Sequence, residues 1–288
     1  MKVAFKSLIA AAAFIAVNAA HAEVQTLAVG ASIEGGSPNG AWSLSDLSGT
    51  GSLQFSSLLI SALNTAKVTL GEVEPADLQV TTTSTTSSSG VVTTRFATVN
   101  ASAPVTSATG DYDDAAGILT VQEVATAGGA TQTTIDNGAT DGDGFLSISN
   151  LKVNLLTKQV FADITGGNGV GTILGYHLWT YTNLEGPTTF AVPTERVTQT
   201  ISATNTITGL FASTAAMDLI DQALNLNGIG RSSLNTVNNP LKGGGAGFGT
   251  IVSNISVIAT PVPEPSTYAL MGVGLVGLGL MARRRRAS

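Results

Sequence analysis

The chain has 288 residues, of which 43% are hydrophobic and only 11% are charged, and it contains 33 glycines and no cysteine. The charged fraction is less than half of the roughly 25% typical of soluble domains, which excludes disorder driven by charge, and the lack of cysteine excludes disulfides, thiolate metal sites and a thiol nucleophile. Between residues 23 and 262 about 18 acidic residues face about 7 basic ones; such an acidic body repels phosphates, which argues against nucleic-acid binding.

The first 22 residues, MKVAFKSLIAAAAFIAVNAAHA, have the pattern of a secretory signal peptide. Two lysines precede an apolar run that ends in the small-x-small sequence Ala20-His21-Ala22. The apolar run is shorter than the roughly 20 residues that a bilayer span needs. The pattern therefore predicts export through the secretory translocon and cleavage by signal peptidase after Ala22, which leaves Glu23 as the mature N-terminus.

Alternation of apolar and polar residues dominates the body, residues 23–260, and indicates strands. The stretches 146–155 and 158–166 alternate around a short turn and predict a hairpin. Further strands are expected at 91–99, 117–126, 171–183, 196–210 and 248–259.

Two stretches, 55–68 and 213–228, have helical spacing instead. The second has a capping residue at Ser213 or Thr214 and a stop signal at Gly228. The sequence therefore predicts a mainly β body, an antiparallel β-sandwich-like or β-rich α+β domain, with two short amphipathic helices lying on the sheet.

The stretch TTTSTTSSSG, residues 81–90, has low complexity. It fits a flexible or glycan-bearing segment that divides the body in two, or a long Thr-rich strand with its turn inside one domain. We favour the strand. The glycine-rich GGGAGFG near Arg231 and Lys242 has no helix start or Lys-Ser/Thr after it, and predicts a flexible loop rather than a phosphate site.

No catalytic residue is predicted from the sequence. His177 is the one histidine left after removal of the signal peptide, and it lies within a predicted strand without a G-x-S-x-G or zinc-helix motif. The candidates that remain are two acidic clusters, Asp111, Asp113 and Asp114, then Asp136, Asp141 and Asp143.

The second cluster lies in DNGATDGDG, which resembles part of a calcium loop but lacks its closing glutamate. Turn chemistry alone also selects Asp, Asn and Gly here. No cofactor is therefore expected, and calcium held by Asp136, Asp141 and Asp143 stays open as the alternative. A hydrolase that uses two facing carboxylates, Asp111 and Asp143, stays open as the alternative to a non-enzymatic role.

The tail VPEPSTYALMGVGLVGLGLMARRRRAS contains glycines at the spacing of a dinucleotide-binding loop. Such a loop needs a further strand after it, and none follows, so the sequence argues against a dinucleotide site here. Residues 268–282 would form a transmembrane helix of roughly 22 Å, short of the ~30 Å hydrocarbon core and adequate only as a transient anchor. Tyr268 would lie at the interface, and the basic tail would stay cytoplasmic, with Arg283, Arg284, Arg285 and Arg286.

This order of parts, a Pro-Glu-Pro triplet, a short Gly/Leu helix and a terminal arginine cluster, resembles the PEP-CTERM sorting domains. The resemblance implies that residues 261–288 are a signal read by exosortase, a membrane-embedded transpeptidase-like enzyme, at Val262, Pro263, Glu264, Pro265 and Ser266. The two prolines keep this segment extended, as a processing enzyme requires. Residues 101–256, around TDGDGFLSISNLKV and ADITGGNGVG, also resemble uncharacterised passenger regions found ahead of such tails.

The resemblance implies a Gram-negative bacterium that makes extracellular polysaccharide. We expect a protein that crosses the inner membrane, is anchored transiently and then reaches the cell surface or matrix. The expected role is non-enzymatic, in an exopolysaccharide matrix or biofilm, with exosortase and extracellular polysaccharide as partners. The alternatives are a secreted polysaccharide hydrolase and a calcium-stabilised adhesin.

Overall fold

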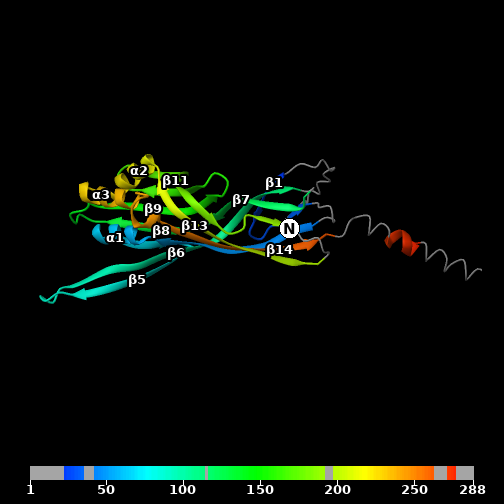
Figure 1. The fold of residues 1–288 in the computed structure, drawn as a ribbon, viewed down its shortest axis with the longest axis horizontal. Coiled ribbons are helices and arrows are strands. Elements are labelled where there is room, and N and C mark those ends of the chain that lie inside the picture. The colour runs from blue at the N-terminus through cyan, green and yellow to red at the C-terminus, as the bar shows by residue number, and fades with distance from the viewer. Residues whose placement is uncertain (1–22, 36–41, 114–115, 192–196, 263–270, 277–288) are drawn as a thin grey trace, which may run out of the picture.

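The computed structural model describes residues 23–35, 42–113, 116–191, 197–262 and 271–276. Figure 1 shows an elongated body whose strands run along the long axis, with three helices at one end. The strands are β1 (Glu23–Ala28), β2 (Ile33–Gly35), β3 (Trp42–Phe55), β4 (Thr69–Val73), β5 (Asp77–Thr86), β6 (Val92–Asp113), β7 (Ile118–Thr126), β8 (Gly129–Thr134), β9 (Gly144–Asn154), β10 (Gln159–Gly166), β11 (Gly171–Glu185), β12 (Thr189–Ala191), β13 (Gln199–Ala212) and β14 (Gly249–Pro261).

The strands form one antiparallel sheet that closes on itself. Hydrogen-bonded neighbours follow the order β7-β6-β3-β14-β13-β11-β10-β9, and β7 also pairs with β9 through residues 123–125 and 152–154. The mainly β, antiparallel prediction is confirmed, but the described strands make a closed ring rather than the two facing sheets of a sandwich. The alternation is the same in both architectures, because each strand buries one face in either case.

The predicted hairpin is confirmed as β9 and β10, and the other five predicted strands correspond to β6, β7, β11, β13 and β14. Strand β3 was not predicted, although it lies in the ring between β14 and β6. Its sequence, WSLSDLSGTGSLQF, is rich in Ser and Gly and contains a single β-branched residue, Thr50, of the kind that signals a strand.

Both predicted helices are present, as α1 (Ser57–Thr65) and α2 (Thr214–Leu224). Each begins at a serine whose Oγ accepts a backbone N–H: Ser56 from Leu59 at 3.1 Å and Ser213 from Ala216 at 3.2 Å. Helix α2 ends at Asn225, which adopts the left-handed conformation with φ of 51°.

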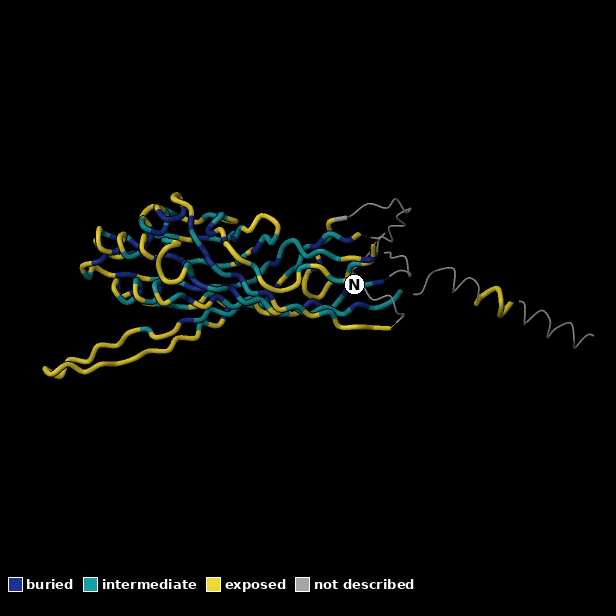
Figure 2. Tube along the Cα trace, in the orientation of Figure 1, coloured by how far each residue is buried: buried dark blue, intermediate teal, exposed yellow. Residues whose placement is uncertain are grey.

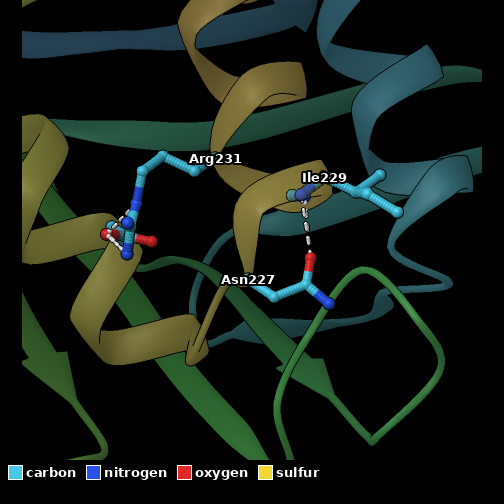
Figure 3. Close-up of polar contacts among 5 residues, drawn as sticks. Asn227, Ile229 and Arg231 are labelled. Carbon is cyan, nitrogen blue, oxygen red and sulfur yellow. Dashed lines mark hydrogen bonds and ion pairs between the residues drawn. The ribbon is translucent and has the colours of Figure 1, made fainter.

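A third helix, α3 (Gly228–Val237), begins where the sequence predicted a stop at Gly228. Asn227 caps it, because its Oδ1 accepts the N–H groups of Ile229 at 2.9 Å and Gly230 at 3.3 Å (Figure 3). Gly230 lies so close to the carbonyl oxygen of Ala139 that a Cβ would approach it to 2.3 Å. This glycine is therefore required for close packing, and it does not mark the end of a helix.

An ion pair joins α2 to α3. Arg231 Nη2 lies 2.6 Å from Asp221 Oδ2, and Arg231 Nε donates to the same oxygen at 2.7 Å (Figure 3). The hydrogen bond and the charge of Asp221 raise the pKa of the exposed Arg231 guanidinium above its usual value.

The described core divides into two clusters along the ring. The helix-end cluster lies under α1, α2 and α3 and includes Leu63, Leu146, Ile220 and Leu234. The exit-end cluster lies at the opposite end and comprises Leu27, Trp42, Leu44, Leu47, Val105, Tyr112, Val124 and Ala259. In this second cluster the rings of Trp42 and Tyr112 pack edge-to-face with centroids 4.5 Å apart.

Strand β5 and the first half of β6 form a hairpin arm that projects beyond the helices (Figure 2). Residues 81–86 thus form a strand, the reading that the sequence analysis favoured. Nearly the whole of β5 is exposed, and hydroxyls pair across the arm, as Ser84 does with Thr94 at 3.0 Å.

The cap of α3 can be tested by Asn227→Ala, which removes the acceptor for Ile229 and also the Nδ2 donor to the Gly138 carbonyl. We expect the free energy of unfolding, measured by urea denaturation, to fall by about 1–2 kcal/mol. Asn227→Asp keeps the acceptor and should recover most of this loss. An alanine variant as stable as the wild type would show that the cap does not hold α3.

Candidate functional site

The segment that leads into the predicted sorting signal is β14, which lies between β13 and β3 in the ring. It carries the chain away from the helices, and its last residue, Pro261, pairs with Trp42 in the exit-end cluster. Val262 follows without regular structure. The remaining predicted sorting and topology residues lie outside the described residues: Pro263, Glu264, Pro265, Ser266, Tyr268, Arg283, Arg284, Arg285 and Arg286.

Residues 271–276 of the tail are helical, and their apolar side chains are exposed, Met271 by 60% and Val273 by 71%. Among the residues described, no helix has both the length and the apolar character needed to cross a membrane. The rest of the predicted span, residues 268–270 and 277–282, lies outside the described part of the chain.

The predicted mature N-terminus coincides with the start of the fold. Glu23 is the first residue of β1 and pairs with Tyr112 of β6, so the chain belongs to the sheet from this position onward. The predicted signal peptide, including Ala22, lies outside the described residues.

Asp136, Asp141 and Asp143 lie in the connection between β8 and β9. Two hydrogen bonds connect this loop to the helices. The Asp141 N–H donates to the Asn225 carbonyl at 2.9 Å, and Asn137 Nδ2 donates to the Ala66 carbonyl at 2.5 Å. Within the described ranges, no group of three or more His, Asp or Glu side chains lies close enough to hold a metal ion. Turn chemistry accounts for the composition of this loop, and calcium binding there stays a prediction.

Asp111 and Asp143, the carboxylate pair of the hydrolase alternative, lie far apart in the sheet. Asp111 pairs with Thr120 of β7, on one side of the contact between β7 and β9, whereas Asp143 precedes the start of β9 on the other side. More than about ten residues of strand separate them, which at ~3.3 Å per residue exceeds roughly 30 Å. Glycosidases hold their two carboxylates about 5–10 Å apart.

Asp113 and Asp114 complete the first acidic cluster. Asp113 closes a turn by accepting the Ala116 N–H at 3.0 Å. Asp114 lies outside the described residues.

His177 lies in β11, as predicted, half-buried with its ring 5.3 Å from that of Phe161. Its Nε2 has no hydrogen-bond partner. Nearby on the same strand, burial raises the pKa of Tyr181, whose hydroxyl donates to the Leu155 carbonyl at 3.3 Å. Both residues thus lie in a packed strand and form no arrangement of an acid with a base.

Residues 261–286 match the family model described as the PEP-CTERM protein-sorting motif. The chain carries a PEP-CTERM sorting motif. The match begins at Pro261, the last residue of β14, so the motif starts where the sheet ends. It implies export and processing by exosortase at a membrane. Comparison with curated proteins and with solved structures found no match.

The sequence analysis did not predict a cavity of about 180 Å³ that lies inside the ring. Its wall comes from strands far apart in the sequence, among them β3, β6 and β14, which only ring closure brings together. The sequence does contain the small residues that line this cavity, such as Gly51 and Ala103. Only the strand register shows that they face the inside of the ring together.

We expect calcium to have no effect on the melting temperature of this protein. Because Asp136, Asp141 and Asp143 do not converge, we expect the same melting temperature in millimolar calcium as in EDTA, measured by circular dichroism. The variant with all three residues changed to asparagine should behave identically in both buffers. A calcium-dependent rise that this variant abolishes would contradict the expectation.

Proposed function

We propose that this protein is a non-enzymatic component of the surface or polysaccharide matrix of a Gram-negative bacterium, delivered through its PEP-CTERM motif. The observation that carries the proposal is the position of the motif directly after β14. Cleavage beyond Pro261 would leave every strand of the ring intact, so the folded body would be released or transferred whole. The ring would then be the part of the protein that is delivered, and the tail would be its sorting signal.

The absence of an enzymatic role is part of the proposal. It is supported by the distance between Asp111 and Asp143, which lie on opposite sides of the contact between β7 and β9. It is also supported by the packing of His177 against Phe161 within a strand. General acid–base catalysis requires such groups to converge on one substrate.

Contact with polysaccharide is proposed for the arm formed by β5 and the first half of β6. Its exposed side chains are mainly threonine and serine, which both donate and accept hydrogen bonds and carry no charge. Sugars offer hydroxyls of the same kind. Because the arm is a paired hairpin, its hydroxyls are spaced regularly along an extended surface, which suits a repeating polymer.

Sorting is tested by replacing Pro263, Glu264 and Pro265 with alanine in the producing bacterium. We expect the intact mass of the wild-type protein in the medium or surface fraction to lack the tail, whereas the variant keeps its tail and stays in the membrane fraction. Equal, unprocessed mass in both would show that the tail is a plain anchor.

The arm is tested separately on the purified protein. Changing Thr82, Thr86 and Thr94 to valine and Ser84 to alanine preserves the strands and removes four hydroxyls; we expect weaker retention on immobilised matrix polysaccharide. Thr200→Val, Ser202→Ala and Thr204→Val, on the exposed face of β13, form the matched control and should retain wild-type binding. Equal retention of all three proteins, or no retention of the wild type, would contradict the proposed contact.

A further inference from the structure

The cavity of about 180 Å³ lies inside the ring and is lined by residues of both core clusters. The two tryptophans of the chain both lie in its wall, Trp42 from the exit-end cluster and Trp179 from the helix-end cluster. An eight-stranded closed sheet is just wide enough to be filled by side chains or to hold one small ligand. The cavity is therefore of the size and in the place where such a sheet holds a molecule.

Small inward-facing residues create the space. Gly51 of β3 pairs with Ala103 of β6, and Ile255 of β14 pairs with Ala203 of β13. Gly51, Ala103 and Ala203 all line the cavity, together with Ala101. We call these four residues the waist. In the register they take neighbouring inward positions, because Ala101 pairs with Leu53, two residues along β3 from Gly51, and Ala203 lies two residues along β13 from Asn205, the partner of Ser253. Protein interiors are otherwise close-packed, so small residues at neighbouring inward positions leave room there.

The wall is apolar and carries no formal charge. Among the described residues that line the cavity there is no Asp, Glu, Lys, Arg or His. A charged molecule would lose its hydration there without gaining a counter-charge, which is strongly unfavourable. The cavity therefore selects a neutral ligand.

Two buried polar atoms on lining residues have no hydrogen-bond partner: Ser253 Oγ and Trp179 Nε1. Ser253 pairs with Gly51 in the sheet and so lies at the level of the waist. Buried polar groups normally have partners, and an unpaired hydroxyl in an apolar wall is a point at which a ligand gains a hydrogen bond.

We propose that the ring binds a slender, neutral, apolar molecule with a single hydroxyl or carbonyl group, its hydrocarbon part along the waist and its oxygen hydrogen-bonded to Ser253. An apolar cavity of about 150 Å³ already holds a benzene ring, so this slightly larger cavity accommodates a short aliphatic alcohol of about six carbons. The role is separate from sorting and from polysaccharide contact, because it uses the inside of the ring and neither the tail nor the arm.

The test uses the full mature chain with 1-hexanol as the ligand and toluene as an apolar ligand of the same heavy-atom number without oxygen. We expect both to shift the tryptophan emission, because both tryptophans line the cavity. Hexanoate and hexylammonium should bind at least about tenfold more weakly than 1-hexanol, since the wall offers no counter-charge. Equal affinity for hexanoate, or no change in tryptophan emission with either neutral ligand, would overturn the proposal.

Variants locate the ligand. Ala103→Phe fills the waist and should abolish binding of both 1-hexanol and toluene with an unchanged circular dichroism spectrum. Ala97→Phe, on the exposed part of the same strand, is the matched control and should bind as the wild type does. If Ala103→Phe does not fold, Ala103→Val adds less volume and should weaken binding partially.

Ser253→Ala tests the polar contact. It should weaken 1-hexanol binding by about fivefold, the usual effect of one lost hydrogen bond, while leaving toluene binding unaffected. Binding of 1-hexanol by Ala103→Phe or Ala103→Val as tight as the wild type would overturn the proposal, because the ligand would then lie elsewhere, for example on the exposed apolar helix at residues 271–276. Unchanged 1-hexanol affinity in Ser253→Ala would overturn the assignment of its oxygen.

Discussion

The pairing of β7 with β9 is the constraint on which the rest of the structure depends, because it turns an open sheet into a ring. Residues 123–125 and 152–154 form this seam, and an ion pair between Glu123 and Lys152, 3.3 Å apart, crosses it. A closed sheet has no free edges in its ring, which removes the template for edge-to-edge association. Closure also encloses the inward faces of eight strands and so defines the core.

The ring has two different ends, and this difference organises the protein. Helices α1, α2 and α3 gather at one end, where caps at Ser56, Ser213 and Asn227 begin them. Strand β14 runs the length of the body and delivers the chain to the other end, beside Trp42 (Figure 1). The sorting motif therefore begins at the last residue of the sheet, and its removal leaves all of the ring pairing intact.

The inside and the outside of the body differ in chemistry. The arm of β5 and β6 displays uncharged hydroxyls to solvent, whereas the waist encloses apolar, uncharged space with the hydroxyl of Ser253 at its level. The cavity wall has no charged side chain and the arm has few, among them the exposed Asp77 and Arg95, in keeping with a chain in which only 11% of residues are charged. The low charge content is thus matched by the two kinds of contact proposed for the protein, one with hydroxyl-rich polymers and one with neutral apolar molecules.

Local patterns predicted most of the individual elements. The alternation in β9, β10, β11, β13 and β14 and the helical spacing of α1 and α2 were correct because each of these depends on residues close in sequence. Strand β3 was missed because its Ser and Gly residues carry no strand signal, and it is held by its neighbours β14 and β6. Helix α3 was missed because Gly228 was taken as a stop, whereas it is the first residue of a helix capped by Asn227, and Gly230 serves close packing against Ala139.

The sequence by itself determined the sorting motif of this protein and the mainly β character of its body. A sorting motif is read by its enzyme as a short linear segment, and strand alternation is likewise local, so neither requires the fold. Only the tertiary structure decided that the sheet closes, that Asp111 and Asp143 lie far apart, and that Gly51, Ala103 and Ala203 line one cavity. These are distances between residues remote in the chain, and strand register and ring closure set them.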